Sequence, residues 1–335
     1  MKRLIALIPA AALTALMCAS CAKVESSGIN DANKRLLDSW LQIYHPEAQK
    51  AEQGIYILED ETGSGRATGD SEDYPYVYFT YTATDLDGNI TETTDAKVAQ
   101  QVGTYDRSSY YGPQAALRSG LYAGVEMMIA SMKVGGTRKA VVPGWLATQY
   151  RYDTEEEYFE AVSGTDAIYT VTVHDVYSDI NKVQIDSIER YIAHNFTEKA
   201  DSTKYGYYYI QTQAPTDTTS FGETETVYIN YTGQLLNGTV FDTTIKKTAK
   251  DAYIYSADTD YEPATITLAE DYTEIEMGSS TLIDAFSYCL STMKTGEKGI
   301  CIFYSGLGYG STSTSAIPAY SPLRFDIEMI GTETE

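Results

Sequence analysis

The sequence predicts an α+β protein of two similar domains, each an antiparallel sheet wrapped around a short helix and each preceded by an N-terminal helix. Three observations support this: similar segments recur about 150 residues apart, β-rich runs dominate both halves, and one short helix interrupts the strands of each half. A repeat of this period indicates a domain duplication, since solenoid repeats have periods of roughly 20 to 50 residues. Strands that surround one helix are typical of an α+β domain.

The composition fits two folded domains and excludes some partners. The chain has 335 residues, with 24 Lys and Arg against 47 Asp and Glu, which gives a net charge of −23. A hydrophobic content of 43% is enough for buried cores. Such an acidic chain is not expected to bind nucleic acid, whose phosphates require basic side chains. Adhesion to an anionic membrane surface is disfavoured for the same reason.

The first 20 residues are expected to be a secretory signal peptide. Two basic residues precede an apolar run at 4–17, which is too short to span a bilayer. The small residues before Cys21 resemble a bacterial lipobox, which implies a lipid anchor on Cys21 and residues 21–29 as a tether. We therefore expect an outer-membrane lipoprotein of the cell envelope that contacts the membrane through its lipid only. Secretion without a lipid anchor remains an alternative, and the anchored protein could lie on either face of the outer membrane.

The two domains are predicted at 30–177 and 178–335. Each begins with a helix of apolar residues at helical spacing, 30–45 or 180–195, followed by a strand that opens at Gly54 or Gly206. A hairpin follows in each half, because an alternating strand runs into an Asp-Gly or Asn-Gly turn. The later elements are a short helix ending in Met-x-x-Gly and a closing strand. These segments are 76–81, 131–135 and 169–173 in the first half and 227–231, 291–296 and 323–329 in the second.

The second half carries a series of motifs in a definite order. In chain order they are Tyr231-Thr232-Gly233, Asn237-Gly238, Phe241-Asp242-Thr243-Thr244, Leu282-Ile283 with Phe286, Met293-x-x-Gly296, Leu307-Gly308-Tyr309-Gly310, Ile317-Pro318 and Leu323-x-Phe325. This order resembles the FKBP-type peptidyl-prolyl cis-trans isomerases. The chain departs from that family in Phe286, where a Trp is usual, in a single Pro at 318, and in an enlarged segment at 245–274 that could cover or block a site.

The resemblance implies an isomerase that helps exported proteins to fold and needs neither a cofactor nor a metal. It implies that Phe286 forms the floor of an aromatic pocket, that the Ile283 N–H and the Tyr309 hydroxyl hold substrate carbonyls, and that Asp242 lies near the twisting amide. The residues so assigned are Asp242, Tyr309 and Ile283 as catalytic, and Tyr231, Phe241, Leu282, Phe286, Ile317 and Phe325 as substrate-binding. Asp242 could also be a turn residue.

The residue types suit this chemistry. The barrier to peptide-bond rotation is about 18–20 kcal/mol and arises from lost amide resonance. A site lowers it by binding the twisted amide better than the planar one. A dry aromatic pocket does so because the twisted amide has a less polar carbonyl. The expected partners are therefore proline-containing polypeptides.

The first half reads as a copy without the site. Thr91-Glu92 replaces Phe-Asp, Val125 stands at the floor position, and the loop at 143–148 has no Tyr. We expect it to keep the fold but not the activity. Two alternatives for the whole chain remain: a non-catalytic chaperone or partner-binding lipoprotein, and a structural spacer. Cys289 and Cys301 are expected to be buried thiols, although an exported compartment permits a disulfide.

Overall fold

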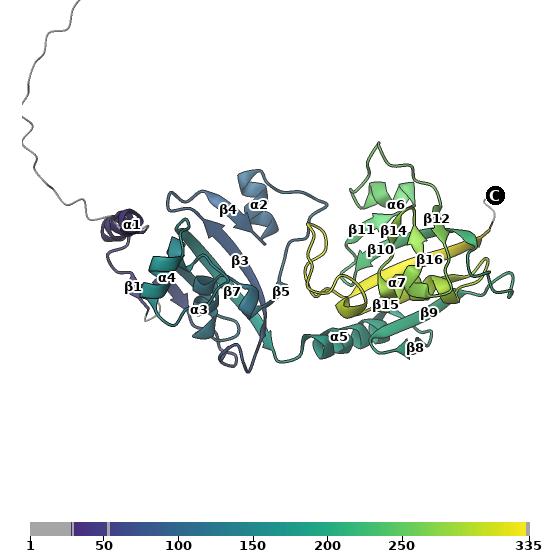
Figure 1. Cartoon of the computed structure of the whole chain (residues 1–335), viewed down its shortest axis with the longest axis horizontal. Helices are drawn as coiled ribbons and strands as arrows, with labels where there is room; N and C mark the ends of the chain where they lie inside the picture. Colours follow the sequence, from purple (N-terminus) through teal and green to yellow (C-terminus); the bar gives the residue numbers. More distant parts are fainter. Residues whose placement is uncertain (1–27, 29, 52–53, 333–335) are drawn as a thin grey trace, which may run out of the picture.

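The computed structural model describes Gly28 and residues 30–51 and 54–332 (Figure 1). The predicted signal peptide 1–20 and Cys21 lie outside the described residues, as does all of the predicted tether 21–29 except Gly28. Among the described residues, no helix has the length and apolar character needed to cross a bilayer.

The first domain is built on one antiparallel sheet. Its strands follow the order β1-β2-β6-β7-β3-β4, and β5 also pairs with β3. The strands are β1 Gln49–Lys50, β2 Tyr56–Glu61, β3 Tyr76–Thr84, β4 Ile90–Thr93, β5 Gln114–Leu117, β6 Thr137–Val142 and β7 Ala167–Tyr177. The helices are α1 Asp31–Tyr44, α2 Ala96–Val102, η1 Arg118–Gly120, α3 Ala123–Ala130, η2 Gly144–Leu146 and α4 Glu155–Ala161.

The second domain repeats this topology. Its sheet has the order β14-β13-β12-β10-β16-β15-β9-β8, with β11 also on β10. The strands are β8 Asp201–Lys204, β9 Tyr207–Gln213, β10 Thr226–Leu235, β11 Val240–Thr243, β12 Ala264–Thr267, β13 Glu276–Met277, β14 Ser280–Thr281, β15 Lys298–Phe303 and β16 Leu323–Gly331. The helices are α5 Ile180–Asn195, α6 Lys246–Asp251, η3 Tyr272–Glu274, α7 Asp284–Thr292 and η4 Ser305–Leu307.

The predicted α+β class and the duplication are confirmed. Strands β2, β6, β7, β3, β4 and β5 have the same neighbours as β9, β15, β16, β10, β11 and β12. Each sheet packs against its own short helix, α3 or α7, in a separate hydrophobic core. Both predicted hairpin turns are present, with Gly88 at φ 87° and Gly238 at φ 89°.

Strand β15 shows how the sequence builds the second domain around its sheet. Its run Ile300-Cys301-Ile302-Phe303 is buried along its whole length. Successive side chains of a strand point to opposite faces. Cys301 and Phe303 therefore pack into the core that contains α7, whereas Ile300 and Ile302 meet α5 through Ile188. The sheet is covered on both faces, and α5 follows β7 directly along the chain (Figure 1).

One segment differs from its predicted role, and one helix is fixed by a local capping motif. The enlarged segment 245–274 is not particular to the second domain, because helix α6 and strand β12 match α2 and β5 of the first. Helix α4 opens with the acidic residues Glu155, Glu156 and Glu157, which remain largely on the surface. The Thr154 hydroxyl accepts from the Glu157 N–H, and the Glu157 carboxylate accepts from the Thr154 N–H, which forms a capping box.

Candidate functional site

The nine residues predicted for the site line one cavity of about 410 Å³ in the second domain. They come from strands β10, β11 and β16, from the start of α7 and from the loop after η4. The fold brings them together because β10 lies between β11 and β16. The lining that sequence reasoning missed consists of Met277, Ser280, Thr281, Thr314 and Ala316.

Aromatic rings form the base of the cavity. The Phe286 ring stacks on Phe325 with 4.6 Å between centroids, and Tyr231 lies 5.4 Å from Phe286. Phe241 meets Phe325 edge to face at 5.7 Å. Such offset and edge-to-face contacts are favourable geometries for aromatic pairs. Phe286 and Phe325 are almost fully buried, so the floor is a packed apolar surface.

Gly233 permits this ring packing. It lies on β10 opposite both Asp242 and Phe325. A Cβ atom at this position would come within 2.6 Å of Phe241 and 2.9 Å of Phe325. Only glycine therefore lets both rings approach the strand, which accounts for the third residue of the Tyr-Thr-Gly motif.

The Asp242 carboxylate is fixed by a neighbour. The Tyr231 hydroxyl donates a hydrogen bond of 2.6 Å to Asp242 Oδ2. Burial, and then the charge of Asp242, raises the pKa of Tyr231 far above its usual value of 10.0. The phenol therefore remains a donor at neutral pH. Asp242 lies on strand β11 and lines the cavity, so its interpretation as a turn residue is wrong.

Two residues that line the cavity carry donors without a partner among the described residues. Ile283 is the N-cap residue of α7, and its N–H makes no hydrogen bond there. The Tyr309 hydroxyl also makes no hydrogen bond within the described chain, and the residue is 39% exposed. Burial and the Asp242 charge raise the Tyr309 pKa, so this hydroxyl keeps its proton. Both groups can donate to an incoming carbonyl.

The segment 245–274 does not fill the cavity, because none of the lining residues belongs to it. The β13–β14 hairpin and the loop at 314–317 form the rim instead. That loop is tied by the Thr314 N–H, which donates to the Ile317 carbonyl at 2.9 Å, and by the Ile317 N–H, which donates to the Thr314 hydroxyl at 3.1 Å.

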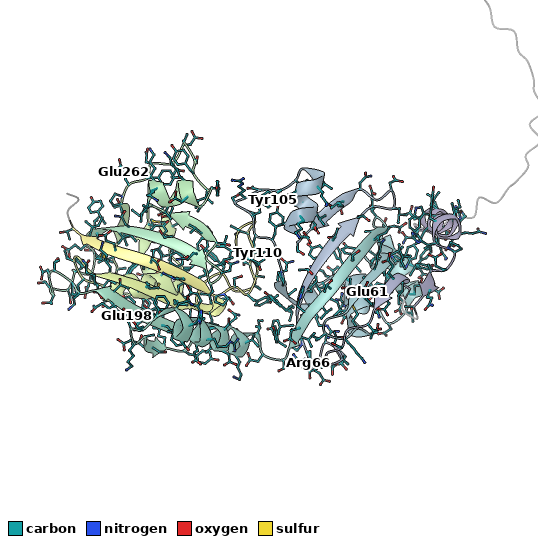
Figure 2. All side chains as sticks on the ribbon, turned by 180° about the vertical axis from the view of Figure 1, so that it is seen from behind. Glu61, Arg66, Tyr105, Tyr110, Glu198 and Glu262 are labelled. Atoms are coloured by element: carbon teal, nitrogen blue, oxygen red, sulfur yellow. The ribbon has the colours of Figure 1, made fainter. Side chains whose placement is uncertain are left out.

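The first domain touches the rim loop. The main-chain N–H of Tyr110 donates to the Ser315 carbonyl at 2.7 Å, and the Tyr110 ring packs against the second core. Figure 2 shows Tyr110 between the two domains. Nearby, the Arg107 guanidinium lies 4.3 Å from the centroid of Tyr253, and Tyr76 meets Tyr320 edge to face at 5.3 Å.

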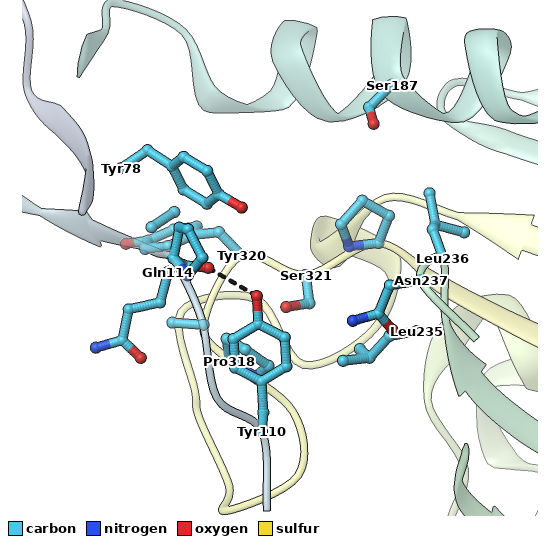
Figure 3. A pocket seen from close by; sticks show the side chains of 14 residues that line it. Tyr78, Tyr110, Gln114, Ser187, Leu235, Leu236, Asn237, Pro318, Tyr320 and Ser321 are labelled. Atoms are coloured by element: carbon cyan, nitrogen blue, oxygen red, sulfur yellow. Dashed lines mark hydrogen bonds between the residues drawn. The ribbon is translucent and has the colours of Figure 1, made fainter. Parts of the chain in front are cut away.

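A smaller cavity of about 190 Å³ lies on the far side of this loop, between the domains (Figure 3). Tyr78 and Tyr110 line it from the first domain, and Pro318 and Tyr320 from the second. The loop at 314–322 therefore contributes to both cavities: its first part, 314–317, lines the candidate site, and its second part, 318–322, lines the cavity between the domains.

Cys289 and Cys301 are free and buried, as expected from the sequence. Burial, and then the adjoining Cys289, raises the pKa of the Cys301 thiol well above its usual value. Within residues 30–51 and 54–332, no three His, Cys, Asp or Glu side chains form a group that could hold a metal ion.

The first domain keeps a cavity at the matching place, of about 230 Å³. Val125 lies in it at the position of Phe286, as predicted, and Thr148 stands at the position of Tyr309. The Tyr81 hydroxyl and the Glu92 carboxylate keep the hydroxyl–carboxylate pair at 3.0 Å, but the floor ring and the loop tyrosine are absent, so the loss of isomerase activity in this domain stays a prediction.

Comparison with known proteins supports the sequence resemblance. Residues 218–330 match the family model of the FKBP-type peptidyl-prolyl cis-trans isomerases. The chain is 31% identical over 111 residues to FK506-binding protein 59 of Drosophila melanogaster, which covers 33% of this chain and 20% of that protein. It is 31% identical over 112 residues to peptidyl-prolyl cis-trans isomerase FKBP11 of Bos taurus, covering 33% of this chain and 43% of that protein. The chain thus spans less than half the length of either relative.

Solved structures show weaker similarity. The three FKBP domains of wheat FKBP73 have 14% identity and a TM-score of 0.30, covering 84% of this chain and 95% of that one. FkpA from Escherichia coli has 22% identity and a TM-score of 0.33, covering 45% of this chain and 58% of that one. The sequence match and the ordered motifs identify the second domain: it belongs to the FKBP-type peptidyl-prolyl cis-trans isomerase family.

Proposed function

We propose that the second domain catalyses cis–trans isomerisation of Xaa-Pro bonds in polypeptides. One observation carries this proposal: the aromatic floor, the Tyr231–Asp242 pair and the two free donors at Ile283 and Tyr309 converge on one cavity. The cavity contains no nucleophile activated by a base, and rotation about an amide requires none.

The mechanism follows from what the cavity can bind. A prolyl ring packs on Phe286 and Phe325, which removes water from the amide. Loss of resonance makes the carbonyl of the twisted amide less polar, so the apolar floor favours the twisted form over the planar one. The Ile283 N–H and the Tyr309 hydroxyl hold neighbouring carbonyls and fix the peptide while the bond turns.

Asp242 has an electrostatic role. Its carboxylate accepts from the Tyr231 hydroxyl and lines the cavity, where we expect it to lie next to the rotating amide. As resonance is lost, the amide nitrogen becomes pyramidal and the carbonyl carbon more electrophilic. A fixed carboxylate stabilises the positive end of this changing dipole, and because it is already oriented it costs no reorganisation during the reaction.

Refolding kinetics test the proposed isomerase activity and the contribution of Tyr309. Uncatalysed Xaa-Pro isomerisation takes tens to hundreds of seconds and limits the folding of many proteins. The purified protein should accelerate a proline-limited refolding reaction. Tyr309→Phe should reduce this acceleration about tenfold through loss of one hydrogen bond, whereas Tyr205→Phe, at an exposed position of the same domain, should leave it unchanged. Equal rates for the two variants would remove Tyr309 from the site.

We also propose that the chain acts on exported proteins from a lipid anchor at Cys21. The basic, apolar and small-residue pattern of residues 1–21 supports this. Cells that express the protein should incorporate a labelled fatty acid into it, and Cys21→Ser should abolish the label. Label that persists in Cys21→Ser would contradict the anchor.

A protein that suppresses client aggregation without accelerating isomerisation would favour the chaperone alternative.

A further inference from the structure

The cavity of the first domain differs from that of the second in the side chains that line it. It is lined by Tyr81, Glu92, Leu121, Tyr122, Val125 and Tyr169, among others. Strand register relates it to the second domain: Glu92 and Tyr169 lie opposite Ala83 on β3, as Asp242 and Phe325 lie opposite Gly233 on β10. The two cavities can therefore be compared position by position.

Aromatic rings are lost at some positions and gained at others: Val125 and Thr148 stand where the second domain has Phe286 and Tyr309, whereas three exchanges add polar groups or a ring. Tyr169 replaces Phe325 and so adds a hydroxyl, while Tyr122 replaces Ile283 at the N-cap of the short helix and adds a ring. Glu92 replaces Asp242 with a longer carboxylate. Three tyrosines and one carboxylate thus surround a space where the second domain has an apolar floor.

The carboxylate has no cationic partner in the described part of the chain. Glu92 forms no salt bridge there and accepts only from the Tyr81 hydroxyl at 3.0 Å. No Lys or Arg among the described residues lies over the rings of Tyr81, Tyr122 or Tyr169. Arg118, the basic residue at the adjoining η1 turn, is buried and points to Glu126 at 2.8 Å instead.

The three tyrosines differ in exposure, because Tyr81 and Tyr169 are half-buried and Tyr122 is exposed. Tyr122 is 45% exposed, and the centroids of Tyr81 and Tyr169 lie 6.5 Å apart. Burial, and then the charge of Glu92, raises the pKa of Tyr169 to about 12. Neutral ring faces beside a carboxylate attract a cation, because the negative faces of the rings and the carboxylate act together.

We propose that this cavity binds an alkylammonium group, in the first place the side chain of a lysine in a polypeptide. A lysine side chain suits it twice: its methylene stem packs on Leu121 and Val125, and its ammonium group reaches Glu92 and the rings. The net charge of −23 favours the approach of such cations. The first domain would then hold basic segments of a chain, whatever the activity of the second.

Methyl-selective NMR on the full protein tests this proposal. The probes are a glycine-flanked lysine peptide, the same peptide with norleucine in place of lysine, and tetramethylammonium. The lysine peptide should shift the Leu121 and Val125 methyl signals with a dissociation constant on the order of 1 mM, and the norleucine peptide should bind at least tenfold more weakly. Equal binding of the two peptides, or shifts at Leu282 instead, would overturn the proposal.

Variants separate the carboxylate from the rings. Glu92→Gln should weaken lysine-peptide binding about fivefold, while Glu61→Gln, an equal charge change at an exposed position, should not. Tyr169→Leu should weaken binding and Tyr169→Phe restore it, since only the ring is needed. Unchanged affinity in Glu92→Gln or Tyr169→Leu would refute the site. Tighter binding of tetramethylammonium than of the lysine peptide would refute the polypeptide source.

Discussion

The main-chain N–H of Tyr110 in the first domain donates a hydrogen bond of 2.7 Å to the Ser315 carbonyl in the second. Ser315 stands between Thr314 and Ala316, which both line the candidate isomerase cavity. The domain without the FKBP-type site residues thus holds the rim of the cavity in the domain that has them. Through this contact the first domain can affect the shape of the cavity in the second.

Loss of the Tyr110 ring should loosen this rim. In Tyr110→Ala the ring no longer anchors to the second core, so amides at 310–317 should exchange faster and the KM for an Xaa-Pro peptide should rise about threefold to tenfold with little change in kcat. Tyr105→Ala is the matched control, because Tyr105 is on the same loop but stacks on Tyr111. Exchange at 310–317 that is unaltered in Tyr110→Ala would contradict this coupling.

The floor position should tolerate a larger ring better than a smaller side chain. Phe286 is almost fully buried but lines a cavity of about 410 Å³, which leaves room for a larger ring, so Phe286→Trp should retain folding and activity. Phe286→Leu removes the stacking on Phe325 and should lower kcat/KM at least tenfold, with a loss of stability of about 1–2 kcal/mol. Urea unfolding and isomerase rates measure the two effects. Full activity in Phe286→Leu would show that the Phe286 ring contributes to packing of the core and not to catalysis.

Gly233→Ala tests the close ring approach. The added methyl would meet Phe241 and Phe325 at less than van der Waals distance, so it should displace both rings and cost about 1–3 kcal/mol. Activity should fall with stability, because the displaced rings form the cavity. Gly222→Ala, where the nearest atom to the new Cβ is a flexible Glu225 oxygen at 3.6 Å, should be neutral. Equal melting temperatures for the two variants would disprove the packing argument.

Alkaline pH should destabilise the second domain through Tyr231. Burial, and then Asp242, raises its pKa above the usual 10.0, so the folded state keeps the proton that the unfolded state loses. The stabilisation is full below about pH 10 and is lost as the pH rises from there toward the folded-state pKa, by about 1.4 kcal/mol per pH unit for one group. Urea midpoints of Tyr231→Phe should fall less steeply above pH 10 than those of the wild type. Parallel curves would refute this linkage.

The sequence predicted most of the site because its motifs mark backbone positions. Register along β10 forces Tyr231, Asp242 and Phe325 to one region once the hairpin turn at Gly238 is recognised. The turn dipeptides and the alternation of apolar residues are local signals, so the N-terminal helices, the hairpins and the closing strands could be placed from spacing, whereas helices α2, α4 and α6 were not predicted. The duplication then supplied an independent check of each element.

What escaped prediction depends on contacts between distant segments. The Tyr231–Asp242 bond joins residues on two strands, and nothing in the order of the motifs shows which hydroxyl would reach the carboxylate. The contact of Tyr110 with Ser315 crosses between domains and uses main-chain atoms, which leave no trace in side-chain patterns.

The most direct test of the central claim is exchange NMR on a short Xaa-Pro peptide with and without the protein. We predict that catalytic amounts of the full chain speed the exchange between the cis and trans signals at least a hundredfold, and that Phe286→Leu removes at least nine-tenths of this effect. An exchange rate equal to that of the free peptide, measured with protein shown to be folded, would contradict an isomerase site in the second domain.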